Sequence, residues 1–375
     1  MYKLNTSATA LNYILTNTGY KPPKDVIYND KIYDIHGRPK SIKNIISKTN
    51  KTKNPDLMNF ISVYTDYTLQ VNVSNHYMFM VKYVDPRLPL SDMFDILQSE
   101  EHIRWVHVDQ LHEGHYLALT LDTTQHKKVT VPIVEGNTVI HYKLNHSRLW
   151  FLLGYFLHYG VFETQINYKN CILLTIYDQK EEELLNYLDE FIDFIPTIFS
   201  NGLNDACVYR IQLHERTFQI LSHLIDKKSI PEWIHSGSRF YLHSFIHGFL
   251  YNVHGIHSTY NKNSFMYTWT IKTKEIILKN INIELLLSLQ LILFKCDIIN
   301  AIQSEDRKNY SIHRMIIYKE KKENQLYPFF NQKFIWIPFK KKEYISEYSI
   351  NTTSHILNND NNTCIVNNII MKYVP

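Results

Sequence analysis

The sequence predicts a mixed α/β (α+β) fold, with short strands near both chain ends and helices in the middle. Two observations predict it. Two apolar stretches, residues 149–163 and 245–256, carry glycines within otherwise helical patterns. Alternating apolar and polar runs occupy residues 1–82 and return after residue 333, as is typical of strands in antiparallel sheets.

The first apolar stretch predicts a helix with one close neighbour. One face carries four large apolar residues, Leu149, Leu153, Phe156 and Leu157. Gly154 allows a second helix to approach because it has no side chain, and Gly160 is the expected end of the helix. Gly248 gives the second stretch the same form about a hundred residues later. The pattern therefore predicts either two ordinary core helices or a pair packed about a pseudo-twofold axis.

The composition limits which classes of protein the sequence can belong to. The 375 residues are 45% hydrophobic, and the net charge of +4 permits nucleic-acid contact without requiring it. The four cysteines are widely scattered, with no metal-ligand spacing and no secretory signal, which favours free thiols in an intracellular compartment such as the cytoplasm, nucleus or a virion. The apolar run 281–294 contains Glu284 and Gln290 and is too short to cross a bilayer. No membrane association is therefore expected.

Strand patterns follow in order through the first 120 residues. Residues 31–45 show apolar runs around a turn at His36 and Gly37, and residues 60–65 alternate again. Val73-Ser-Asn-His76 then precedes another apolar strand. Near the C-terminus, residues 333–339 and 358–373 repeat the pattern.

These end segments resemble the Hint domain of inteins, an all-β horseshoe formed by both ends of the chain. Val73 to His76 resembles the Thr-x-x-His motif, whose histidine protonates the scissile amide; here the threonine position is Val73. Inteins close with His-Asn, and the matching positions are Lys372 and Tyr373. The first residue is Met1 rather than Cys, Ser or Thr. The resemblance thus implies a splicing site that retains His76 alone, in a structural role.

The two glycine-containing helices resemble the LAGLIDADG motifs of homing endonucleases. Residues 152–160 and 246–254 match the motifs, although Gly255 comes one position late. The resemblance implies a pseudo-twofold αββαββα domain whose two motif acids hold divalent metals. The acid positions are Tyr159 and Val253, and neither offers the carboxylate oxygen that Mg²⁺ prefers.

The same resemblance implies a domain division and a DNA surface. The Hint domain would comprise residues 1–140 and 325–375, and the endonuclease-like domain 141–324. Each half of the latter would contribute a sheet to the DNA major groove, with Lys272 and Lys274 as alternating DNA contacts. The basic run 340–342 is either a further contact or plain surface charge.

Three hypotheses follow. The first is a catalytically degenerate intein- and homing-endonuclease-derived protein that acts as a DNA-binding or structural module, without metal or other cofactor. The second is an active site-specific endonuclease that uses Mg²⁺, for which Glu163 is the nearest carboxylate to the first motif. The third is a scaffold in a larger assembly such as a viral particle, with tyrosine-rich protein contacts. The implied partners are double-stranded DNA, for the first two, and assembly proteins, for the third.

Overall fold

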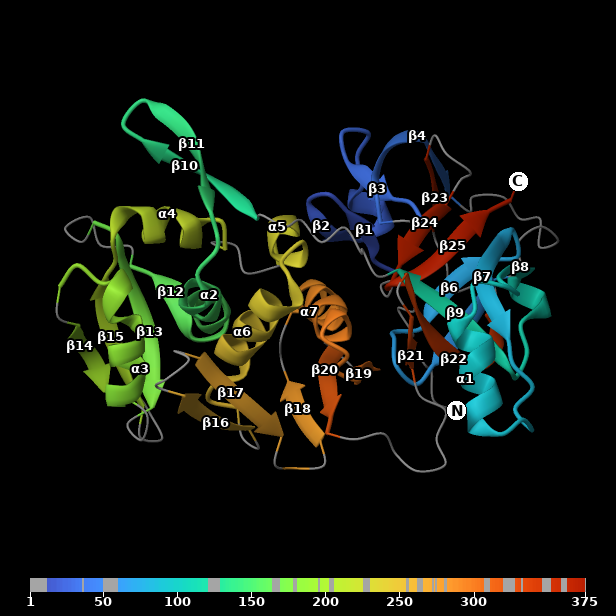
Figure 1. The fold of residues 1–375 in the computed structure, drawn as a ribbon. Helices are drawn as coiled ribbons and strands as arrows, with labels where there is room; N and C mark the ends of the chain where they lie inside the picture. Colours follow the sequence, from blue (N-terminus) through green and yellow to red (C-terminus); the bar gives the residue numbers. More distant parts are fainter. Residues whose placement is uncertain are drawn as a thin grey trace, which may run out of the picture. The chain divides into compact units, whose positions relative to one another are not determined.

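The computed structural model describes most of the chain. The described residues are 12–35, 37–49, 60–120, 129–163, 169–177, 181–194, 196–201, 206–224, 230–253, 256–261, 266–271, 273, 275–279, 282–306, 311–319, 328–331, 333–345, 352–358 and 363–374. They form a mixed α/β structure with mostly antiparallel sheets and several helices (Figure 1). No described helix has the length and apolar character needed to cross a membrane.

The chain divides into two compact units. Unit 1 comprises residues 1–124 and 277–375, and unit 2 comprises residues 125–276. Both chain ends thus belong to one unit and the middle to the other. The boundaries differ from the predicted 140/141 and 324/325, because the hairpin at 130–143 falls in unit 2 and residues 277–324 fall in unit 1.

Unit 1 is built on a long antiparallel sheet, which has fourteen strands among the described residues. Its central path runs β23 (Thr352–Asn358), β4 (Pro39–Thr49), β3 (Lys31–Tyr33), β1 (Ile14–Thr16), β24 (Thr363–Val366), β25 (Ile369–Tyr373), β7 (Tyr77–Tyr83), β9 (His115–Thr120), β22 (Phe334–Ile345), β5 (Phe60–Thr65) and β6 (Val71–Ser74). Three shorter strands join at the sides, β2 (Gly19–Lys21), β8 (Arg104–His107) and β21 (Phe329–Phe330). Strands from the first and last segments of the chain therefore interleave in one sheet.

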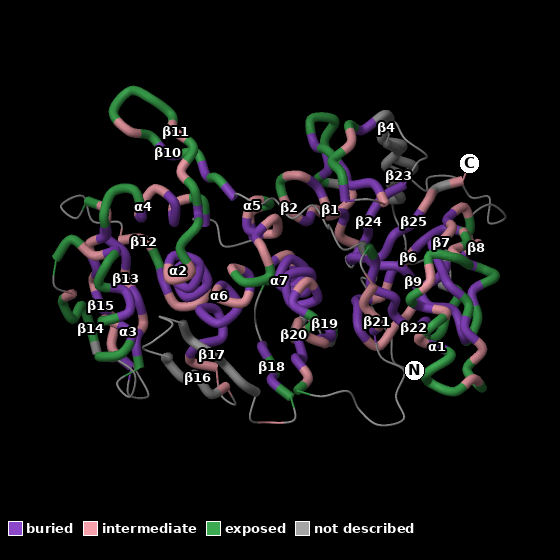
Figure 2. The backbone as a smooth tube through the Cα atoms, viewed as in Figure 1, coloured by how far each residue is buried: buried purple, intermediate pink, exposed green. Residues whose placement is uncertain are grey.

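The core of unit 1 follows from the alternation of apolar residues along these strands. Phe79, Leu117 and Ile337 are fully buried in one cluster, and Trp336 and Met80 lie in another. Strands β7, β9 and β24 in the middle of the sheet are mostly buried (Figure 2). Helices α1 (Leu90–Gln98) and α7 (Ile283–Lys295) complete the unit, with the three-stranded sheet β18 (Glu275–Lys279), β20 (Ser311–Tyr318) and β19 (Asn300–Asp306); the boundary between the units falls inside β18.

Unit 2 contains the two predicted glycine-containing helices, α2 (Ser147–Tyr159) and α6 (Arg239–Leu250). From α2 the chain continues through β12 (Gly160–Phe162), β13 (Cys171–Tyr177), α3 (Glu181–Leu188), β14 (Thr197–Asn201), β15 (Ala206–Gln212) and α4 (Glu215–Ser222). This is the order αββαββα. The four strands form one sheet in the order β12-β13-β15-β14.

The chain after α6 follows a different course. The short helix α5 (Glu232–His235) leads into α6, and β16 (Ile256–Asn261) and β17 (Met266–Ile271) then pair with each other. A third strand, β18, precedes α7, and α7, β19 and β20 belong to unit 1. A hairpin of β10 (Thr130–Glu135) and β11 (Thr138–Lys143) also belongs to unit 2, where the side-chain amide of Gln219 in α4 hydrogen-bonds both N–H and C=O of Val134.

Candidate functional site at the ends of two glycine-containing helices

Helix α2 is almost wholly buried, because its apolar residues occupy every face rather than one stripe. Residues 149–157 are all buried. The helix ends at Gly160, whose N–H donates to the carbonyl of Phe156. A β-carbon at Gly160 would lie 2.3 Å from the buried Phe156 ring, so any larger residue here would force that ring to shift. The predicted end of this helix is therefore the observed one.

Helices α2 and α6 pack backbone against backbone at Gly154 and Gly248. A β-carbon at Gly154 would lie 1.9 Å from the carbonyl oxygen of Phe245, and one at Gly248 would lie 2.0 Å from that of Phe151. The contact is reciprocal, since each glycine faces the residue three positions before the other glycine. Gly248 lies 94 residues after Gly154, and Phe245 lies 94 residues after Phe151, so the two contacts are related by one constant offset, as expected for a pseudo-twofold axis between the helices. Figure 1 shows the two helices side by side.

The same offset of 94 residues pairs Tyr159, the last residue of α2, with Val253, which lies three residues after the end of α6. The Tyr159 hydroxyl receives a hydrogen bond from the backbone N–H of Asn252, and its ring lies 4.9 Å from that of Tyr155. Burial raises the pKa of Tyr159, and the nearby Tyr177 raises it further. Tyr159 is therefore a neutral phenol at neutral pH. Val253 is half-buried and has no ligating atom.

Hydrogen bonds of neutral groups surround this pair. Tyr155 donates from its hydroxyl to the carbonyl of Thr175 at 2.7 Å, and Asn252 Nδ2 donates to the same hydroxyl at 3.0 Å. Burial also raises the pKa of Tyr155. Among the described residues, no group of three or more His, Cys, Asp or Glu side chains could hold a metal ion. The hydroxyls of Tyr155 and Tyr159 and the amide of Asn252 thus form a hydrogen-bonded cluster at the end of α2, and none of the three carries a carboxylate.

Glu163, the carboxylate that follows the predicted motif 152–160, forms an ion pair with Arg210. Its side chain is 4% exposed, and its Oε2 lies 3.2 Å from Arg210 Nη2 and receives a hydrogen bond from Arg210 Nε. The guanidinium also lies over the Phe199 ring. Because the buried carboxylate already has a cationic partner, it is a poor candidate for a metal ligand.

The sheet of unit 2 has very little charge. Arg210 is the one charged residue in β12, β13, β14 and β15, and Glu163 neutralises it. Exposed apolar side chains are present instead, with Val161 52% and Phe199 43% exposed. The strands with which this half was expected to contact DNA therefore offer one paired cation. Lys272 and Lys274 lie outside the described residues.

Two of the positions predicted from the resemblance to Hint domains, His76 and Tyr373, lie close together in unit 1. His76 lies in the turn between β6 and β7, where its carbonyl accepts a hydrogen bond from Val374 N–H at 2.8 Å. Tyr373 in β25 pairs with Tyr77 in β7, so His76 and Tyr373 lie at the same end of neighbouring strands. Val73 is buried within β6. Position 1 lies outside the described residues.

Ion pairs account for most of the basic run 340–342. Lys340 Nζ lies 2.6 Å from Asp66, and Lys341 Nζ lies 2.5 Å from Glu343. Lys342 Nζ donates to the carbonyl of Asp109. These contacts within unit 1 favour the surface-charge interpretation of this run.

Sequence reasoning missed a buried polar network that anchors α7 within unit 1. Gln290 is fully buried, and its Nε2 donates to Tyr67 O at 2.8 Å and to Asn300 Oδ1 at 3.2 Å. Its Oε1 accepts from Asn368 Nδ2 at 2.8 Å, and the Tyr20 hydroxyl donates to Asn368 Oδ1. The sequence signal for this network is Gln290 itself, a polar residue within the apolar-rich run 281–294.

Comparisons with known proteins find similarity in structure alone. No family model matches the sequence, and a comparison with curated proteins finds no match. Mesophilic variants of the homing endonuclease I-DmoI are similar at a TM-score of 0.29 and 14% identity, over 46% of this chain and 88% of theirs. For I-DmoI in complex with DNA and Ca the TM-score is 0.30 and the identity 14%, over 46% of this chain and 82% of that one. For I-DmoI in complex with DNA and Mn the TM-score is 0.29 and the identity 13%, over 46% of this chain and 89% of that one. Similarity at these TM-scores does not define the fold of this chain.

Proposed function

We propose that this chain is a catalytically degenerate protein derived from an intein with an embedded homing endonuclease, and that it acts by binding double-stranded DNA. The observation that carries the proposal is the reciprocal contact of Gly154 and Gly248, which brings together two helices, the first ending at Tyr159 and the second three residues before Val253. A paired-helix interface of the endonuclease type is thereby combined with groups that cannot bind a hard cation. In this proposal the Hint-like part comprises residues 1–140 and 325–375, and the endonuclease-like part comprises residues 141–324.

The Hint-like part also combines a suitable arrangement of residues with the loss of a reactive group. His76, in the turn before β7, lies beside the neighbouring strand β25 that carries Tyr373, as a Hint-type site requires, but tyrosine has no side-chain amide that could cyclise. This arrangement supports the proposal that the chain retains the fold of an intein but has lost the splicing reaction.

A restoration experiment tests the proposal. The double variant Tyr159→Asp/Val253→Asp places two carboxylates at the paired helix ends, and it is incubated with a randomised DNA library and Mg²⁺. Gain of nicking, absent from the wild type and from Tyr159→Asn/Val253→Asn, would support the assignment of the motifs. The amide variant matches the acid variant in size, so it controls for altered packing.

A well-folded acid variant that cuts no sequence would count against the motif assignment. Nicking by the wild-type protein that Tyr159→Asn/Val253→Asn retains would instead support the alternative of an active Mg²⁺-dependent endonuclease with ligands elsewhere. Circular dichroism establishes in each case that the variant is folded.

One observation favours a second candidate function, that of a scaffold in a protein assembly. The sheet of unit 2 carries exposed Val161, Ile198 and Phe199 and one neutralised cation, a composition that suits protein contact better than phosphate contact. Native-size separation of cell extracts tests it: co-migration with a large complex, lost in Val161→Ser/Phe199→Ser, supports the scaffold. Migration as a free protein at every extract concentration contradicts it.

A further inference from the structure

Positive charge is concentrated at one end of the chain. Residues 1–53 contain ten Lys and Arg side chains against three Asp, a net charge of +7. The remaining 322 residues contain 30 basic and 33 acidic side chains, a net charge of −3. The overall value of +4 therefore hides a strongly basic segment within unit 1, and such asymmetry is typical of nucleic-acid contact.

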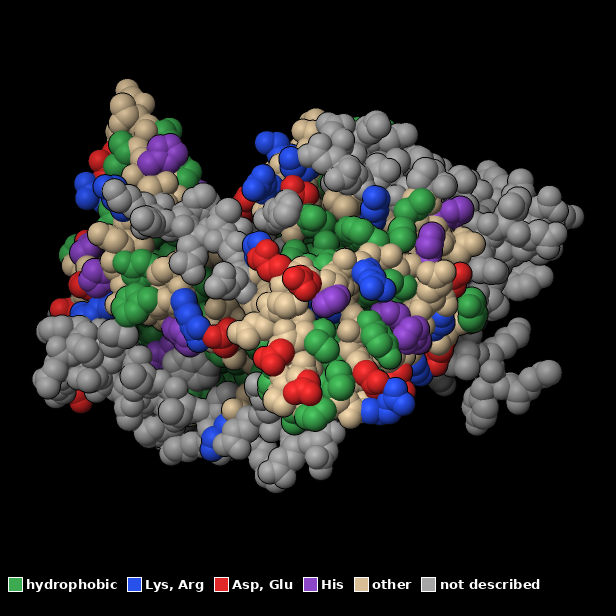
Figure 3. Space-filling model, turned by 45° about the vertical axis from the view of Figure 1, so that its right-hand side comes forward, with side chains coloured by type: hydrophobic (Ala, Val, Ile, Leu, Met, Phe, Trp, Pro, Cys, Tyr) green, Lys and Arg blue, Asp and Glu red, His purple; other side chains and the backbone are tan. Residues whose placement is uncertain are grey.

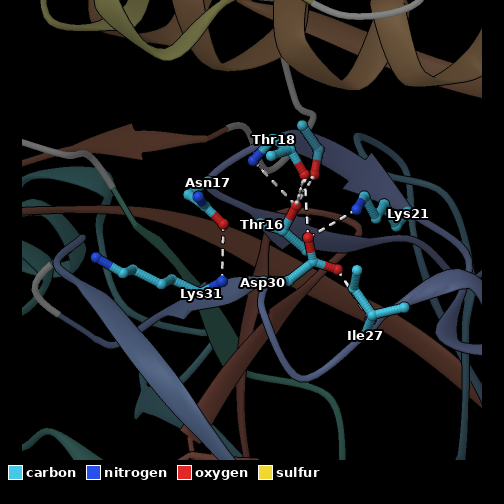
Figure 4. A network of polar contacts seen from close by, with 8 residues as sticks. Thr16, Asn17, Thr18, Lys21, Ile27, Asp30 and Lys31 are labelled. Atoms are coloured by element: carbon cyan, nitrogen blue, oxygen red, sulfur yellow. Dashed lines mark hydrogen bonds and ion pairs between the residues drawn. The ribbon is translucent and has the colours of Figure 1, made fainter.

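Asp30 lies in this segment but faces inward (Figure 4). Its Oδ2 accepts a hydrogen bond from Ile27 N–H at 2.9 Å, and its Oδ1 lies 2.7 Å from Lys21 Nζ and accepts from the Thr18 hydroxyl. Burial acts to raise the pKa of Asp30, but the bonds from Ile27 and Lys21 outweigh it, so the net pKa is lowered. This carboxylate holds the loop before β3 in shape.

Asp34 has the same role at the next turn. It is 8% exposed, its Oδ1 accepts from Arg38 N–H at 2.9 Å, and its carbonyl accepts from Gly37 N–H at 3.0 Å. Gly37 has a φ of +69°, which this turn requires. Lys40 Nζ lies 3.9 Å from the Asp34 carboxylate. Two of the three acids of the segment are thus used to build turns.

Two cations remain exposed on the hairpin that these turns shape. Lys31 begins β3 and pairs with Ser41 of β4, and Arg38 lies in the turn just before β4. No ion pair of either side chain is found within the described part of the chain. Tyr28, 59% exposed, lies in the loop before Lys31. Figure 3 shows Lys and Arg side chains gathered at the top of unit 1, where Figure 1 places β2 and β3.

We propose that the hairpin of β3 and β4, with Lys31 and Arg38, is the surface of this protein that contacts the phosphate backbone of duplex DNA. The inference rests on the proposed DNA binding and places it in unit 1 rather than on the charge-poor sheet of unit 2. Fixed turns hold the two cations in place, and each neutralises a phosphate and releases counterions on binding.

The test measures binding of the full chain to a 30-base-pair duplex of mixed sequence by fluorescence anisotropy across a salt series. The test variant is Lys31→Gln/Arg38→Gln. The control is Lys333→Gln/Lys341→Gln, which removes the same charge from two exposed lysines of unit 1 that are paired with Glu100 and Glu343. Thermal melting establishes that both variants are folded.

We expect the test variant to bind at least about tenfold more weakly near 0.1 M salt, with a log–log salt slope smaller by about 2, because two phosphate contacts are lost. The control should remain within about twofold of the wild type, because its lysines are not phosphate contacts. Wild-type affinity in the test variant, or equal losses in both variants, would overturn the assignment of the surface while leaving DNA binding intact. Absence of wild-type binding at low salt would overturn the proposed DNA binding itself.

Discussion

The carbonyl oxygen of Phe245 occupies the space that a β-carbon on Gly154 would need, 1.9 Å from its ideal position. Because the atom in the way belongs to the backbone, no side-chain rotation can relieve the overlap. The contact therefore depends on glycine itself, and the same holds at Gly248 against Phe151.

Replacing Gly154 by alanine should be severely destabilising. We expect Gly154→Ala to lower the free energy of unfolding by about 3 kcal/mol or more, because the two buried helices must move apart to admit the methyl group. Urea denaturation measures the loss. Gly136→Asn is the control, since no atom lies within 4 Å of a β-carbon there and asparagine tolerates its φ of +58°. Equal stability of Gly154→Ala and wild type would contradict the packing described.

The pair of Glu163 and Arg210 should respond asymmetrically to mutation. Arg210→Met leaves a carboxylate that is 4% exposed without its partner, and we expect a loss of about 3 kcal/mol. Arg216→Met removes an exposed pair with Glu135 and should cost less than about 1 kcal/mol. Chemical denaturation at neutral pH compares the two. A small effect of Arg210→Met would show that Glu163 is hydrated and available for other ligands.

Acid should destabilise unit 1 through His115. Burial lowers the pKa of this histidine to about 4; the charges of His112 and Lys342 act in the same direction, and a hydrogen bond with the His112 backbone opposes them. Its folded pKa lies below the unfolded value near 6.5, so the unfolded chain binds the proton more tightly. The contribution of neutral His115 is therefore fully present above pH 6.5 and is lost as pH falls towards 4, by about 2 kcal/mol after allowance for partial hydration.

The variant His115→Gln tests this, since its side-chain oxygen can still accept the hydrogen bond from His112 N–H. Its unfolding free energy should vary less with pH between 6.5 and 4 than that of the wild type. The exposed His141→Gln should keep the wild-type pH dependence. Identical curves for His115→Gln and wild type would mean that His115 titrates normally.

Gln290 should be essential to the stability of unit 1. Gln290→Met leaves Asn368 Nδ2, Asn300 Oδ1 and the Tyr67 carbonyl without this partner in the interior, and we expect a loss of about 3 kcal/mol. Gln219→Met is the control, because it also removes two hydrogen bonds but at an exposed position. Thermal unfolding distinguishes them, and equal shifts would contradict the role of the network in anchoring α7.

The sequence predicted those features that depend on nearby residues. Gly154, Gly160 and Gly248 each carry a local signal, because a glycine within or after an apolar helical run has few other uses. The mixed α/β class followed from the two periodicities. The domain boundaries at 140/141 and 324/325, and the roles of Lys272 and Lys274, remain predictions.

Features that depend on distant residues could not be predicted in this way. Gln290 and Asn368 are separated by 78 residues, and the residues around each of them do not indicate that the two side chains form a hydrogen bond. The same applies to α7, whose apolar pattern indicates burial but not the unit that buries it. Glu163 looked available as a ligand because its partner Arg210 comes 47 residues later.

The interleaved sheet of unit 1 also has a consequence for synthesis. The backbone of Tyr13 accepts from Asn367 N–H and its own N–H donates to the Asn367 side chain, across 354 residues. At about 5–20 residues per second, a ribosome needs roughly 20–70 s to make the chain between them. The first segment of the nascent chain must therefore wait with open strand edges while residues 125–276 emerge and can fold. Holding chaperones that bind such edges should have their longest window of action on this segment.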